Sequence, residues 1–293
     1  MPWQQLSLVA GDLDPEVLSA FFEQQGALSV TFMDAAEQPL FEPDPGTTPL
    51  WSATRITALF SVDTDFPALK QRLAKEYGAD VLARLDQETL HDQDWERLWL
   101  ERFHPMRFGE RLWICPDGQR PPAQDDAVLI DLDPGLAFGT GTHATTALCL
   151  EWLDAHAPVQ QSVLDYGCGS GVLAIAALKL GAEQVWGVDI DEQALWASRD
   201  NAARNHVDDS LWTGLPRLLP DRQFDLVLAN ILANPLIELA AGLAGLVRPE
   251  GQLVLSGILS AQAEAVRAAY ARWFALSDPV GRDGWIRLHG RRN

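Results

Sequence analysis

The chain has 293 residues, of which 47% are hydrophobic and 22% charged, as is typical of a folded protein long enough for two domains. Its 41 acidic and 22 basic residues give a net charge of −19 at pH 7, which disfavours nucleic acid and favours a basic protein partner. Three cysteines without a Cys-x-x-Cys pair predict neither a disulfide framework nor a metal site. Without a signal peptide or an apolar run of about 18 residues, we expect a cytoplasmic protein with no membrane partner.

Residues 1–92 predict a small α+β domain. Asp14 and Pro15 predict the start of a helix that buries Val17 together with the next apolar residues and ends at Gly26. A second helix is expected over 66–77. Alternating apolar residues predict four strands, around Leu6, around Val30, over 56–62 and over 81–85. The resulting β-α-β-β-α-β order is the ferredoxin-like pattern.

Residues 93–126 predict a connector between two domains. Asp94 can cap a helix that places Trp95, Leu98, Trp99 and Arg102 on one face. The prolines and glycines that follow end this helix, and a polar loop over 119–126 leads into the next domain.

Residues 127–293 alternate between strand and helix, which predicts a doubly wound α/β domain built on a parallel sheet. The expected strands are 162–166, 185–189, 224–229, 252–256 and 285–288, and the expected helices between them are 172–180, 192–204, 236–247 and 261–273.

A glycine-rich turn follows the strand 162–166. Gly167, Gly169 and Gly171 permit a tight turn and a close approach of the backbone to a ligand. Asp189 ends the next strand, where a carboxylate can accept both ribose hydroxyls of an adenosine-type ligand. The turn and Asp189 together predict a nucleoside cofactor. Because Val172 stands where a dinucleotide fingerprint needs its third glycine, a nicotinamide cofactor is disfavoured.

A second glycine-rich segment, residues 133–146, ends in threonines and a histidine at the start of a helix. Hydroxyls and backbone N–H groups there suit a carboxylate ligand. The alternative is that Thr142 only caps the helix and His143 packs beside it; we favour this for His143, which has no partner at metal-ligand spacing.

Asn230 follows the strand 224–229, at the end of the strand where open α/β sheets bind ligands. It resembles the position of the Asn-Pro-Pro-Tyr motif of amine methyltransferases, although the prolines and the tyrosine are absent. A turn-forming asparagine without a catalytic role is the alternative.

Together these segments resemble one family along the whole chain. The segments that carry the resemblance are Trp95-Glu96-Arg97, His104 to Gly109, Asp133 to Thr146, Asp165 to Gly171, Asp189-Ile190-Asp191 and Asn230-Ile231-Leu232. The glycine spacing resembles motif I of the S-adenosylmethionine-dependent, Rossmann-like methyltransferases. The segment from Leu132 to His143 resembles that of the PrmA family, the methyltransferases of large-subunit ribosomal protein 11.

This resemblance implies S-adenosyl-L-methionine as cofactor, an N-terminal domain that recognises the free ribosomal protein, and methylation of its lysine side chains and N-terminal α-amine. The family's cofactor contacts fall on Thr145, Gly167, Asp189 and Asn230, and the glycine turn adds Gly169. Asn230 is the candidate for positioning the amine. No general base is assigned and no metal is expected.

Two other functions stay open. A methyltransferase of this fold could act on a small molecule or RNA, in which case the N-terminal domain would not bind the ribosomal protein. A binding module that has lost turnover would bind the cofactor without transferring methyl groups.

Overall fold

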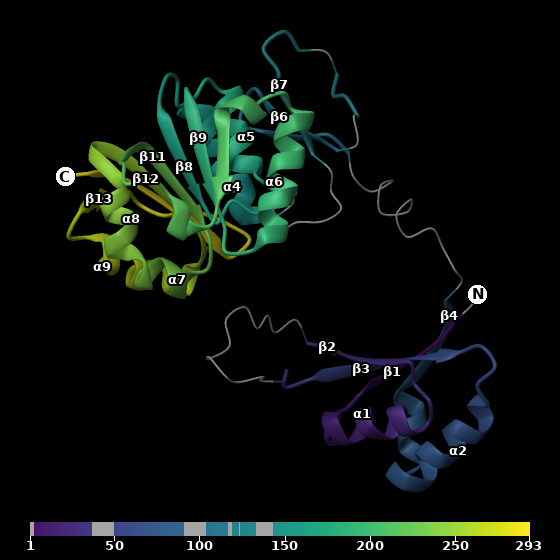
Figure 1. Cartoon of the computed structure of the whole chain (residues 1–293). Coiled ribbons are helices and arrows are strands. Elements are labelled where there is room, and N and C mark those ends of the chain that lie inside the picture. The colour runs from purple at the N-terminus through teal and green to yellow at the C-terminus, as the bar shows by residue number, and fades with distance from the viewer. Residues whose placement is uncertain (1–2, 37–49, 91–103, 117–118, 123, 133–142) are drawn as a thin grey trace. The chain divides into compact units, whose positions relative to one another are not determined.

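A computed structural model of the chain describes residues 3–36, 50–90, 104–116, 119–122, 124–132 and 143–293. The chain divides into two compact units, Met1–Leu98 and Trp99–Asn293 (Figure 1). The predicted connector helix that contains Trp95 and Arg102 lies outside the described residues, and so do residues 133–142.

The first unit is a four-stranded antiparallel sheet with order β2-β3-β1-β4 and two α-helices that contribute to one core. This is the strand and helix order of the predicted ferredoxin-like pattern. The elements are β1 (Trp3–Val9), α1 (Pro15–Gln24), β2 (Ser29–Asp34), β3 (Thr54–Ser61), α2 (Phe66–Tyr77), a 3₁₀ helix (Ala79–Arg84) and β4 (Leu85–Leu90).

Two details of the first unit differ from the prediction. The side chain of Asp14 caps α1 as expected, but Val17 is 51% exposed, because the helix buries the face that carries Leu18, Phe21 and Phe22. The predicted strand over 81–85 is wrong: Val81 belongs to the 3₁₀ helix, and the strand begins at Leu85. Val81 is nevertheless buried, so its apolar character did not distinguish the two conformations.

The second unit is built on a sheet of order β10-β9-β8-β11-β12-β15-β13, with β14 paired to β15. The predicted strands β9, β8, β11 and β12 are parallel, as expected. The strand β10, which was not predicted, is parallel to β9, and β15 is antiparallel to β12, β13 and β14. The sheet is therefore mixed. Its strands are β8 (Ser162–Tyr166), β9 (Gln184–Val188), β10 (Leu211–Gly214), β11 (Phe224–Asn230), β12 (Val247–Leu259), β13 (Phe274–Leu276), β14 (Val280–Arg282) and β15 (Trp285–Arg292).

Helices cover both faces of this sheet (Figure 1). One core contains residues of α4, α5 and α6, and the other contains residues of α7, α8 and α9. The predicted helix over 236–247 is two helices, because the chain breaks at Leu239 and β12 already begins at Val247. The helices are α4 (Ala144–Ala155), α5 (Val172–Lys179), α6 (Glu192–Arg204), α7 (Ala233–Glu238), α8 (Ala240–Leu246) and α9 (Ala263–Tyr270). None of the described helices is long and apolar enough to cross a membrane.

A separate three-stranded sheet precedes α4 in the chain. It consists of β5 (Met106–Phe108), antiparallel to β6 (Leu112–Pro116), which is in turn parallel to β7 (Val128–Leu132). The first two strands fall in the stretch that the sequence assigned to the connector. Phe108 and Leu112 nevertheless pack in the same core as Trp152 of α4, so these strands are part of the second unit.

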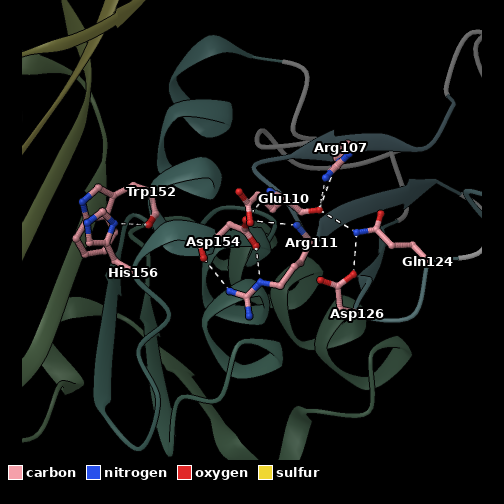
Figure 2. A network of polar contacts seen from close by, with 8 residues as sticks. All are labelled: Arg107, Glu110, Arg111, Gln124, Asp126, Trp152, Asp154 and His156. Atoms are coloured by element: carbon pink, nitrogen blue, oxygen red, sulfur yellow. Dashed lines mark hydrogen bonds and ion pairs between the residues drawn. The ribbon is translucent and has the colours of Figure 1, made fainter.

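A polar network fastens the turn between β5 and β6 to the last turn of α4 (Figure 2). Asp154, which is only 7% exposed, accepts hydrogen bonds from the backbone N–H of Glu110 at 2.6 Å and from Arg111 Nε at 3.3 Å. The guanidinium of Arg111 also donates to the carbonyl of Asp154 at 2.8 Å. Gly109 has a positive φ of 67°, and a side chain there would collide with Asp154. The turn and the helix end are therefore held together as one piece.

Candidate functional site

The predicted site residues gather where β8, β9 and β11 end. These strands are parallel neighbours with β8 in the middle, so their carboxyl ends lie at one edge of the sheet. Ligands of open α/β sheets bind at this edge. The segments that follow the strands begin at Gly167 and Asp189, and Asn230 is the last residue of β11.

The glycine turn after β8 has the backbone that the sequence predicted. Gly167, Gly169 and Gly171 all have positive φ values, of 79°, 52° and 79°, which side chains disfavour. Gly167 N donates to the carbonyl of Val188 at 2.7 Å, which joins the turn to the end of β9. A Cβ on Gly167 would collide with Ile231, so the segment after β11 also lies against this turn.

Asp189 is tied directly to the glycine turn. Its Oδ2 accepts from Gly169 N at 2.9 Å, and its Oδ1 accepts from Asp191 N at 3.0 Å. Because each carboxylate oxygen has more than one lone-pair site, both keep capacity for a further donor. Gly169 and Asp189, which the sequence analysis put forward as a pair, therefore form one structural element.

Asp165 in β8 is a further candidate for the site, which the sequence reasoning noticed in the motif but did not assign to the site. It is 1% exposed; Oδ2 accepts from Ala174 N at 3.1 Å, whereas Oδ1 has no hydrogen-bond partner among the described residues. Burial, with a smaller contribution from the charge of Asp189, raises the pKa of the Asp165 carboxyl to about 7. A charged residue directly after the apolar pair Val163 and Leu164 in a predicted strand is the signal in the sequence that could have identified it.

The start of α4 supplies the remaining polar groups. His143 is the N-cap residue and its Nδ1 lies 2.7 Å from Thr145 Oγ1, while its ring packs edge-on against Trp285 at 5.0 Å. The packing of His143 is the role that we favoured, but the helix cap is His143 itself, whereas the sequence predicted Thr142 as the cap. Thr142 lies outside the described residues. Within the part of the chain that the structure describes, no three His, Cys, Asp or Glu side chains are grouped as metal ligands.

Asn230 lies next to the first turn of α4. Its Nδ2 donates to the hydroxyl of Thr146 at 3.3 Å. The neighbouring residue on β12, Ser256, donates from Oγ to the carbonyl of Thr145 at 3.2 Å. The structure thus brings Thr145 and Asn230 to the same region, where Thr146 links them. The sequence reasoning included Thr146 among the hydroxyls of the segment 133–146 but did not predict its contact with Asn230, which lies 84 residues away in the chain.

The mixed sheet, with β15 antiparallel between β12 and β13, and the glycine turn coupled to Asp189 define a methyltransferase domain of the Rossmann-like class. The profile of the ribosomal protein L11 methyltransferase family, PrmA, matches residues 2–293. The chain therefore belongs to this family.

Comparison with individual proteins gives the same family. The chain is 57% identical to a ribosomal protein L11 methyltransferase of Pseudomonas aeruginosa strain LESB58, over 100% of this chain and 99% of the relative. It is 55% identical to that of Azotobacter vinelandii, over the full length of both. A crystal structure of a ribosomal protein L11 methylase from Lactobacillus delbrueckii subsp. bulgaricus is 35% identical, with a TM-score of 0.60, and covers 65% of this chain and 100% of that one. The predictions of the family and of the fold class are confirmed.

Proposed function

We propose that this protein transfers methyl groups from S-adenosylmethionine to lysine side chains and to the N-terminal α-amine of ribosomal protein L11. Family membership supports the methyl transfer and L11 as its acceptor. The observation that carries the proposal is the coupled turn, in which Asp189 accepts from Gly169 at the carboxyl edge of the sheet. The assignment of lysine and N-terminal amines as the methyl acceptors rests on the resemblance to the family and on the polar groups at the carboxyl ends of the strands.

S-adenosylmethionine is the cofactor, and the residues present fit it. The donor carries two ribose hydroxyls, which the spare acceptor sites of Asp189 can receive. It also carries an ammonium and a sulfonium charge, and the buried Oδ1 of Asp165 is an acceptor without a partner among the described residues. Thr145, in the first turn of α4, would hold its methionine carboxylate. Gly167, whose N–H is already donated to Val188, would lie against the donor because it has no side chain. When bound, the sulfonium supplies an activated methyl group.

The residues at this edge need only hold an amine in line with that methyl group. A lysine amine must be neutral to attack, although its pKa in water is about 10.4. Burial lowers that pKa, and Asn230 can hold the amine by accepting one of its N–H groups. The nitrogen lone pair then forms the N–C bond as the S–C bond of the donor breaks, and the proton of the product amine leaves to solvent. In-line positioning supplies most of the acceleration.

We assign recognition of L11 to the first unit. Residues 1–98 contain 17 acidic and 6 basic residues, so this third of the chain carries −11 of the total net charge of −19. Such a field attracts a basic protein and repels ribosomal RNA. L11 is accordingly captured in the cytoplasm as the free protein. The predicted connector, residues 93–126, is shortened by β5 and β6, which belong to the second unit, so the methyltransferase domain begins before β5 and not at residue 127.

The test uses purified full-length protein, methyl-labelled S-adenosylmethionine, and L11 either free or bound to its ribosomal RNA fragment. Mass spectrometry of the products should place the label on lysine and N-terminal amines of free L11, with much less on bound L11. A variant without the first unit should lose L11 methylation but still bind the cofactor in a calorimetric titration. Label in RNA or in small molecules, with none on L11, would overturn the proposal.

A further inference from the structure

We propose that Thr146 is a positioning residue for methyl transfer: it fixes the orientation of the Asn230 carboxamide so that Oδ1 accepts a hydrogen bond from the target amine. The inference rests on the proposed function, because it assumes an amine acceptor at the strand ends. It goes beyond that function in assigning a role to a residue outside the glycine turn and outside the cofactor contacts.

The contact that carries the inference joins two distant segments. Thr146 is fully buried in the first turn of α4, and its Oγ1 accepts from Nδ2 of Asn230 at 3.3 Å. Asn230 itself is half-buried at the end of β11. One end of the carboxamide is therefore held by Thr146, and no described residue forms a hydrogen bond with the other end, Oδ1, which is left for a different partner.

Thr146 cannot easily move away from Asn230, because the first turn of α4 is held at a second point. Ser256 pairs with Asn230 in the register of β11 and β12, and its Oγ donates to the carbonyl of Thr145 at 3.2 Å. The same hydroxyl lies 3.2 Å from the carbonyl of Ile286 on β15. Successive residues of α4 thus contact the ends of two neighbouring strands.

The orientation of the carboxamide matters because its two ends differ chemically. Nδ2 only donates, whereas Oδ1 only accepts. An attacking amine needs an acceptor for its N–H, so that its lone pair stays directed at the methyl group. A carboxamide turned the other way would donate to that lone pair and block the attack. In the structure the hydroxyl of Thr146 accepts from Nδ2, which leaves Oδ1 turned toward a donor such as the amine.

The test compares Thr146→Val, which keeps the shape but removes the hydroxyl, with Thr146→Ser, which keeps the hydroxyl. On free L11, Thr146→Val should lower kcat by about tenfold or more, as expected for a mispositioned reactant, while the cofactor Kd changes less than about twofold. Thr146→Ser should recover most of kcat. In an Asn230→Ala background, Thr146→Val should have no further effect on kcat.

A second measurement does not depend on activity. In the ¹H–¹⁵N spectrum of the full-length protein, the side-chain amide signal of Asn230, identified by its loss in Asn230→Ala, should shift in Thr146→Val and return in Thr146→Ser. Thr146→Ala serves for both measurements if the valine variant does not fold.

The outcomes separate this inference from the proposed function. If wild-type protein methylates L11 but Thr146→Val leaves kcat and the amide signal unchanged, the inference is wrong and the function stands. A Thr146→Val variant with a weakened cofactor Kd and an unchanged kcat would also overturn it, because Asn230 would then serve the cofactor. If wild-type protein does not methylate L11 amines, the proposed function fails and this inference fails with it.

Discussion

Among the described residues of the second unit, two aspartates are buried, and their surroundings differ. Asp154, near the end of α4, has protein donors on both carboxylate oxygens, from the backbone of Glu110 and from Arg111. Asp165, in β8, has a donor only on Oδ2, from Ala174, and Oδ1 has no partner among the described residues. Both side chains have lost most of their contact with water.

The difference separates a structural group from a functional one. A buried polar atom without a partner destabilises a fold. A buried carboxylate whose two oxygens both have protein donors, such as that of Asp154, therefore needs no role beyond stabilising the fold. A buried carboxylate with a donor on only one oxygen, at the edge of the sheet where ligands bind, indicates that a ligand supplies the missing partner. We therefore expect Asp154 to govern stability and Asp165 to govern cofactor binding, and substitutions can test this division.

The largest expected effect is on the pH dependence of stability through Asp165. The pKa of this carboxyl is about 7 in the folded protein and near 3.8 in the unfolded chain. Between these values the unfolded chain has lost the proton that the folded protein keeps, so the free energy of unfolding falls as pH rises from about 4 to about 7. The full loss is about 4 kcal/mol and persists above pH 7.

Asp165→Asn should remove this slope. In urea unfolding without cofactor, wild type and variant should diverge between pH 4 and pH 7, with the variant relatively more stable at the higher pH. The variant should nevertheless bind S-adenosylmethionine more weakly in calorimetry. Parallel stability curves for the two proteins would show that Asp165 does not keep its proton in the fold, and would remove the contrast with Asp154.

Asp154→Asn should have the opposite pattern, with lower stability and unchanged cofactor affinity. The substitution places an NH₂ group or a weaker acceptor against the N–H of Glu110, which we expect to reduce the free energy of unfolding by about 2–3 kcal/mol. The ion-pair part is small, because the Arg111 side chain is 36% exposed to solvent. Urea unfolding and calorimetry measure the two quantities; a weakened cofactor Kd at native stability would contradict the assignment.

Asp189 provides a further test of the distinction between structural and ligand-binding carboxylates. It is half-buried, and each of its oxygens has one backbone donor and spare acceptor capacity. Asp189→Ala should weaken cofactor binding by about 1–3 kcal/mol, because two ribose hydroxyls lose their acceptor. Asp191→Ala, which removes only the helix cap of α6, is the matched control and should leave the cofactor Kd nearly unchanged. Equal affinities of Asp189→Ala and wild type would exclude Asp189 from the site.

Local signals predicted much of this architecture. The predicted bounds of the strand 162–166 and the helix 192–204 match β8 and α6, since a glycine turn follows the first and the Asp191 cap precedes the second. The apolar run over 236–247 gave no sign of the break at Leu239. The strands β5 and β6 were missed, because they depend on pairing with each other and, for β6, with β7.

In the candidate site, too, some features could be predicted from local sequence patterns and others could not. Gly167, Gly169 and Asp189 belong to patterns that repeat at fixed spacing, so the sequence could place them at one edge. The contact between Thr146 and Asn230 could not be predicted, because it depends on how α4 packs on the ends of β11 and β12. The unequal surroundings of Asp154 and Asp165 likewise appear only when the sheet and helices are assembled.

The smallest expected effect on stability is that of replacing an exposed carboxylate, which serves as a reference for the two buried aspartates. Glu264 is 85% exposed in its side chain and forms an ion pair with Arg267 at 3.4 Å, one turn further along α9. Because water solvates both partners, Glu264→Gln should change the free energy of unfolding by less than about 0.5 kcal/mol and leave the cofactor Kd unchanged. If Glu264→Gln destabilised the protein as much as Asp154→Asn, burial of the carboxylate would not be the cause of the Asp154 effect. That result would force a different explanation of both aspartates.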